Sequence, residues 1–187
     1  MSNSKKAEFF FAGLLIALAV FFLIVAYFDW IDFGVVIGAY RFNHWLVWVG
    51  SLYIAFAVPI YLMLKRRYAA GIRRLFGFHV FGNLTAFILI TIHFSSQISR
   101  PAAFYPDLGT GLALFFSMAL LVATGFSQRF GLVKSAKPQT QRLVHVGFAL
   151  SFYLIIGIHI LHGLGFLQMC LLSYSTRGNT NADFCSG

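Results

Sequence analysis

Four histidines are the chemical signature of this 187-residue chain, because they form two pairs with one common separation. His79 and His93 are fourteen residues apart, and so are His145 and His159. Fourteen steps of about 100° fall within about 40° of four full turns, so both imidazoles of a pair project from one helix face, about 21 Å apart. Each pair lies in an apolar segment, where ionisable side chains are functional candidates by default.

Two such helices that run in the same direction would place the four imidazoles in two facing pairs. Neutral imidazole is a good axial ligand for iron, and a dry site favours the neutral form, so the facing pairs predict two b-type haems between the helices. Ligation by two histidines suits electron transfer rather than oxygen binding at the iron. The alternative is that the histidines are buried polar residues bonded to neighbouring helices, which explains a lone histidine better than a repeated offset.

The composition is that of an integral membrane protein, since 59% of the residues are hydrophobic and only 10% are charged. Five apolar runs meet or approach the length of about twenty residues that a helix needs to cross a bilayer. They predict one all-α domain, an integral membrane bundle of five transmembrane helices. The expected helices cover about residues 8–28, 44–64, 77–97, 108–128 and 143–172, and residues 173–187 form a tail.

The basic residues predict the orientation of this bundle. Eleven of the fourteen Lys and Arg residues lie at the N-terminus, between the second and third runs, or between the fourth and fifth. The other three are Arg41, Arg100 and Arg177. The positive-inside rule therefore predicts a cytoplasmic N-terminus and an external C-terminus. Topology and anionic lipid headgroups then explain the net charge of +9, and no nucleic-acid partner is expected.

The third and fifth helices carry the histidine pairs, and the single helix between them makes both cross the membrane in the same direction. His79 and His145 stand near the cytoplasmic ends of these helices, while His93 and His159 stand nearer the outside, which predicts an inner and an outer haem. Gly82 shares the face of His79 and leaves room for a porphyrin edge. It fits equally well as a small-residue contact between membrane helices.

Haem propionates carry negative charge, so basic residues about one turn beyond the ligands are candidate partners. These are Arg74 and Arg142 at the cytoplasmic side and Arg100 at the external side. The competing explanation for Arg74 and Arg142 is the positive-inside pattern itself. Arg100 is equally explained as an arginine that extends to the lipid headgroups.

Four further residues have two open readings each. His44 and His162 are expected near the outer surface, where they accept protons from a quinol or are interfacial histidines without a special task. Cys170 and Cys185 are both expected on the external side. They form either a disulfide or two unpaired thiols. No Cys-x-x-Cys-His motif occurs, so covalent c-type haem attachment is not expected.

The two ligand segments resemble those of a known group of proteins. Arg-Arg-Leu-Phe-Gly-Phe-His79 continues to His93, and Arg-Leu-Val-His145 continues to His159-Ile-Leu-His162-Gly. This pattern, over about residues 70–165, resembles the dihaem membrane cytochromes b, both the cytochrome b of quinol–cytochrome c oxidoreductases and the transmembrane domain of ferric reductases and NADPH oxidases. The helix count before the first ligand helix looks more like the ferric reductase group. The resemblance implies an inner and an outer b-type haem in a helical bundle.

The chain also departs from both groups. It contains nothing similar to the flavin and nicotinamide domain that the ferric reductase and NADPH oxidase members carry, and no Pro-Glu-Trp-Tyr quinol motif. We therefore expect an electron-transfer subunit of a respiratory or quinone-linked complex in the plasma or energy-transducing membrane, with other redox subunits or a quinol as partners. The alternatives are a stand-alone transmembrane reductase with an external acceptor and a non-redox protein whose histidines bind a metal ion or pack.

Overall fold

The computed structural model describes residues 3–67, 72–100, 108–133, 135 and 137–163. Within these ranges, five α-helices are long and apolar enough to cross a membrane, which confirms the predicted helical fold and its five candidate spans. A short hairpin that the sequence analysis did not predict precedes the second helix. The elements are α1 (Asn3–Tyr27), β1 (Val36–Ile37), β2 (Tyr40–Arg41), α2 (Phe42–Arg67), α3 (Ile72–Ile98), α4 (Leu108–Phe130) and α5 (Pro138–Gly163).

Most helices begin or end several residues outside the apolar runs, because local capping rather than hydropathy sets their ends. α5 begins at Pro138, a residue suited to the first helical turn, and the Gln141 amide donates to the Lys137 carbonyl. α4 ends where Gly131 adopts a φ of 63° and the Leu132 amide donates to the Ser127 carbonyl, a Schellman cap. The expected continuation of the last helix through residues 164–172 lies outside the described residues.

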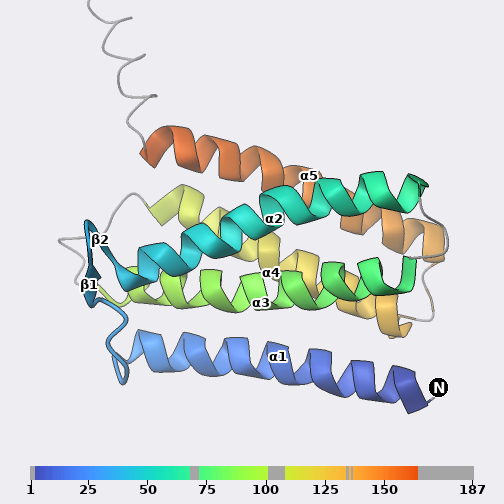
Figure 1. Cartoon of the computed structure of the whole chain (residues 1–187), viewed down its shortest axis with the longest axis horizontal. Coiled ribbons are helices and arrows are strands. Elements are labelled where there is room, and N and C mark those ends of the chain that lie inside the picture. The colour runs from blue at the N-terminus through green and yellow to red at the C-terminus, as the bar shows by residue number, and fades with distance from the viewer. Residues whose placement is uncertain (1–2, 68–71, 101–107, 134, 136, 164–187) are drawn as a thin grey trace, which may run out of the picture.

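α3 is the central helix of the bundle. It contacts α1, α2 and α4, and α5 packs on α4 (Figure 1). α1, α3 and α5 run in one direction and α2 and α4 in the other, so the two histidine-bearing helices are co-directional (Figure 1). We call the end at which α1, α3 and α5 begin the amino end, and the opposite end, which carries β1 and β2, the hairpin end.

A hydrophobic core at middle depth takes residues from all five helices, among them Ala19, Ile54, Ile88, Met118 and Phe152. Hydrogen bonds between helices reinforce it: the Ser95 hydroxyl donates to the Leu23 carbonyl, and the Tyr153 hydroxyl donates to the Ile54 carbonyl. Large apolar side chains also cover the outside of the bundle. This distribution is expected where lipid rather than water surrounds the helices.

An ion pair near the amino end joins α1 to α4. Glu8 and Arg129 are both about two-thirds buried, and the Arg129 guanidinium also lies 4.6 Å from the Phe76 ring centroid. We expect Glu8→Gln to lower the free energy of unfolding by about 1–2 kcal/mol, between the values typical of exposed and buried pairs. Denaturant unfolding in detergent measures this change.

The matched control for this prediction is Lys6→Gln, which removes an exposed charge from the same helix. It should change stability by less than about 0.5 kcal/mol, as is usual at exposed positions. Equal stability of the Glu8→Gln and Lys6→Gln variants would show that the ion pair does not hold α1 against α4.

Candidate functional site

The four predicted ligand histidines lie in two pairs, each within electrostatic range. His79 of α3 lies within electrostatic range of His145 of α5, and His93 of α3 lies within electrostatic range of His159 of α5. All four side chains are partly buried. The structure therefore brings together one histidine pair in the amino-end half of the bundle and one in the hairpin-end half.

A hydroxyl group of α4 contacts each α5 histidine. Thr124 Oγ1 lies 3.0 Å from His145 Nδ1, and Thr110 Oγ1 lies 2.9 Å from His159 Nδ1. Such hydrogen bonds fix the orientation and the tautomer of an imidazole, and they are typical of the surroundings of metal-bound histidines.

A glycine follows each of these threonines and leaves space for the same histidine ring. A Cβ atom added at Gly125 would lie 3.1 Å from His145 Cε1, and one added at Gly111 would lie 3.8 Å from His159 Cε1. Carbon atoms in ordinary contact are about 3.5–4.0 Å apart. Position 125 therefore accepts no side chain without displacement of the ring, whereas position 111 accepts a methyl group.

The sequence analysis missed this Thr-Gly pair on α4, although its signal was present. Thr110-Gly111 and Thr124-Gly125 are separated by the same fourteen residues as the histidine pairs. Thr and Gly are common in membrane helices, so the motif has meaning only beside the histidines that it contacts.

His79 is surrounded by residues of α2 and α3. Tyr61 stacks on its ring at a centroid distance of 4.5 Å and an interplanar angle of 13°, and Asn83 Nδ2 lies 3.1 Å from His79 Nδ1. Lys65 lies within electrostatic range of His79 and 5.8 Å from the Tyr61 ring centroid. Tyr61 and Lys65 were absent from the predicted site because they belong to the second helix, which carries no ligand.

His93 has another histidine as its neighbour. The His44 ring of α2 packs against it edge to face, with centroids 5.3 Å apart. Nδ1 of both rings is buried and makes no hydrogen bond within the described ranges. An unsatisfied buried polar atom costs about 1–3 kcal/mol. His44 thus lies beside the candidate site, while His162 is within electrostatic range of His159.

Two arginines lie near His93 at the hairpin end. Arg41 and Arg100 line a polar pocket of about 220 Å³ together with the acidic residues Asp29 and Asp32, with Asn43, which is 1% exposed, and with Ser96. Burial, together with the nearby Arg41 guanidinium, lowers the pKa of Arg100. Neither arginine forms an ion pair in the part of the chain that the structure describes. The pocket therefore places charges of both signs at the hairpin end.

The other predicted site residues are placed as follows. Arg142 lies within electrostatic range of Tyr61, the residue that stacks on His79. A side chain at Gly82 would overlap the Tyr53 hydroxyl, which donates to the Phe78 carbonyl over 2.7 Å. This contact explains Gly82 as a close approach between α2 and α3. The side chain of Arg74 and residues Cys170 and Cys185 lie outside the described part of the structure.

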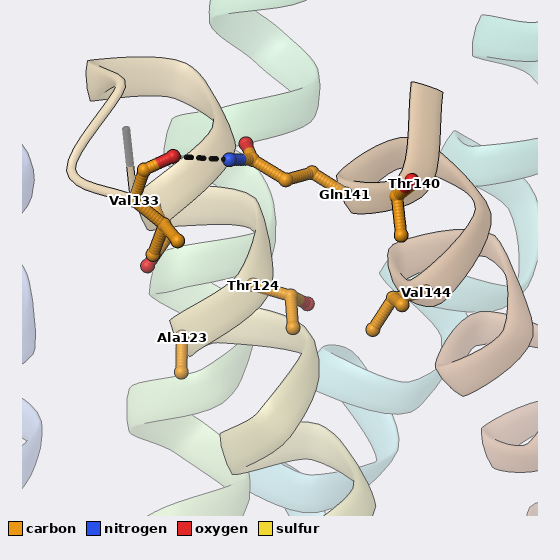
Figure 2. A pocket seen from close by; sticks show the side chains of 7 residues that line it. Ala123, Thr124, Val133, Thr140, Gln141 and Val144 are labelled. Atoms are coloured by element: carbon orange, nitrogen blue, oxygen red, sulfur yellow. Dashed lines mark hydrogen bonds between the residues drawn. The ribbon is translucent and has the colours of Figure 1, made fainter. Parts of the chain in front are cut away.

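A groove of about 280 Å³ opens between α4 and α5 on the amino-end side of this site. Its lining is mainly carbon and includes Thr124, the partner of His145, together with Val144. Figure 2 shows the Gln141 side chain reaching from α5 to the Val133 carbonyl, to which its amide donates over 2.7 Å. The Thr124–His145 contact therefore lies at the edge of an open groove.

The donor set suits a metal that brings its own equatorial ligands. Among the described residues no group of three or more His, Cys, Asp and Glu side chains could hold a bare metal ion. A porphyrin supplies four equatorial nitrogens, so a haem needs only one facing pair of imidazoles. The two histidine pairs, each with one member on α3 and one on α5, fit this requirement.

Comparison with protein families, characterised proteins and solved structures finds no match to this chain. The functional argument accordingly rests on the residues themselves.

Proposed function

We propose that this chain is a membrane dihaem cytochrome b subunit that carries single electrons between the two faces of a cell membrane. The observation that carries the proposal is the pairing of His79 with His145 and of His93 with His159 between co-directional helices. Haem, when bound, supplies reversible one-electron chemistry. The proposed partners are other redox subunits of a respiratory complex and a quinol.

The chain's own residues have three tasks in this proposal. The four histidines hold the two haems, and the threonines of α4 orient two of these ligands. The charges of Arg41 and Arg100 at the hairpin end, and of Lys65, Arg74 and Arg142 at the amino end, neutralise propionates. The apolar core around Met118 and Phe152 excludes water between the two depths.

Haem quantification and a reduced-minus-oxidised spectrum of the protein purified from haem-replete cells test the proposal. We expect two b-type haems per chain, because each haem needs one pair of imidazoles and the chain has two such pairs of histidines. A colourless preparation would instead favour a non-redox protein whose histidines pack or bind a metal ion.

A stand-alone transmembrane reductase is the second candidate, and the polar pocket at the hairpin end favours it. This pocket borders Asn43 and Ser96, which are joined by a 2.8 Å hydrogen bond close to His93, and it has room for a small external acceptor. A reductase should be isolated alone and reduce an added acceptor. A respiratory subunit should instead be isolated together with redox partners.

A further inference from the structure

The two Thr-Gly pairs of α4, Thr110-Gly111 and Thr124-Gly125, have a role beyond their contact with the histidines. We infer that Thr124 and Thr110 are positioning residues which hold His145 and His159 in the Nδ1-protonated tautomer and lower the reduction potential of each bound haem. This inference rests on the proposed dihaem function. It adds α4, a helix that carries no iron ligand, to the residues that define the redox properties.

The hydroxyl proton of Thr124 determines the tautomer of His145. Thr124 Oγ1 lies 2.7 Å from the Leu120 carbonyl oxygen, one helical turn earlier, and 3.0 Å from His145 Nδ1. A hydroxyl has one proton, and a carbonyl oxygen can only accept, so Thr124 donates to Leu120. His145 Nδ1 must then donate to Thr124, and Nε2 keeps the lone pair that binds iron.

Thr110 makes the corresponding contact with His159, although no carbonyl accepts its hydroxyl proton among the described residues. The two atoms involved are 2.9 Å apart, and the offset of fourteen residues from Thr124 matches the offset between the two α5 histidines. The adjacent glycines, Gly111 and Gly125, leave both rings space against α4. α4 therefore presents a threonine hydroxyl and an adjacent glycine to the histidine of α5 in both halves of the bundle.

The ligands of α3 have no such hydroxyl. The partner of His79 Nδ1 is the Asn83 amide, and His93 Nδ1 has no hydrogen-bond partner among the described residues. The threonines of α4 thus hold His145 and His159 of α5 in a defined orientation before any metal binds. A hydrogen bond from Nδ1–H raises the basicity of the ligand, which stabilises the oxidised iron and lowers its reduction potential.

The test compares Thr124→Val and Thr110→Val in the purified protein with two measurements. Redox titration of the bound haems should show that Thr124→Val raises the potential of the haem at His145 and Thr110→Val that of the haem at His159. We expect a change of about tenfold in the ratio of reduced to oxidised haem, equal to about 59 mV for a one-electron couple. Nitrogen NMR of labelled histidine in the haem-free protein reports the tautomer directly.

Two controls accompany these variants. Thr124→Ser keeps the hydroxyl and should retain the wild-type potential and tautomer. Thr85→Val removes an exposed hydroxyl of α3 that donates only to the Phe81 carbonyl, and should change neither measurement.

The outcomes separate the inference from the proposed function. Unchanged potentials and tautomers in both valine variants, or equal shifts at both haems, would overturn the inference. Wild-type protein without haem would overturn the proposed function, and the tautomer measurement would then decide the role of the threonines by itself. If Thr124→Val does not fold, Thr110→Val tests the inference at His159.

Discussion

Replacing His145 by alanine is expected to halve the haem content, from two haems per chain to one. His145 and His79 face each other from α5 and α3, so removal of either ring leaves an iron without one axial ligand. Haem quantification against protein concentration measures the loss, and the remaining haem should belong to the His93–His159 pair. His79→Ala should give the same spectrum as His145→Ala, because both variants lose the same haem.

The control for this prediction is His162→Ala, which removes a histidine one turn beyond His159 without removal of a proposed ligand. It should keep two haems. A haem content of two in His145→Ala would exclude His145 from the ligand set, and a different spectrum in His79→Ala would contradict the pairing.

The test of the histidine pair at the hairpin end, His93 and His159, needs one further variant. His93→Ala should also lower the haem content to about one per chain, unless the His44 ring, which lies 5.3 Å from the His93 ring, replaces it as the ligand. The substitution is therefore best compared in the presence and in the absence of His44. One haem in the His44→Ala/His93→Ala double variant and two in His44→Ala would assign His93 as the ligand.

Gly125→Val is expected to remove the same haem as His145→Ala without a change in any ligand. A Cβ at this position would lie 3.1 Å from His145 Cε1, and the two methyl groups of valine need more space still. α4 itself should remain helical, because valine has a higher intrinsic helix propensity than glycine. We expect about one haem per chain, measured by haem quantification, with the helical circular dichroism unchanged.

Two glycines serve as controls for Gly125→Val. Gly147→Val places the same side chain on α5, two residues from His145, where no atom lies within 4 Å of the added Cβ. Gly111→Ala adds a methyl group 3.8 Å from His159 Cε1, an ordinary contact. Both variants should keep two haems, and equal loss of haem in Gly147→Val would show that the ring of His145 is not the cause.

Under the proposed dihaem function, the two histidine pairs would differ in their surroundings. The amino-end pair has Tyr61 stacked on His79 and an open groove beside Thr124. The hairpin-end pair has His44 against His93 and a polar pocket that contains two arginines. Nearby charge and solvent access both change the potential of a haem, so these surroundings are expected to give the two haems different potentials.

The amino-acid sequence by itself determined the number of spans and the pairing of the histidines. Apolar runs of about twenty residues leave few alternatives to membrane helices, since each backbone polar group must be satisfied within its own helix. One intervening helix makes α3 and α5 co-directional, and a separation of fourteen residues places both histidines of a helix on one face. These properties depend only on distances along the chain.

The tertiary structure alone decided which other residues surround the four histidines. The helices are apolar on nearly all sides, so hydropathy does not show how each helix is rotated about its own axis. That rotation determines the contacts of Thr110 and Thr124 with the α5 rings, of Tyr61 with His79, and of His44 with His93. Such contacts arise from packing between helices, so the spacing of residues within one helix does not identify them by itself.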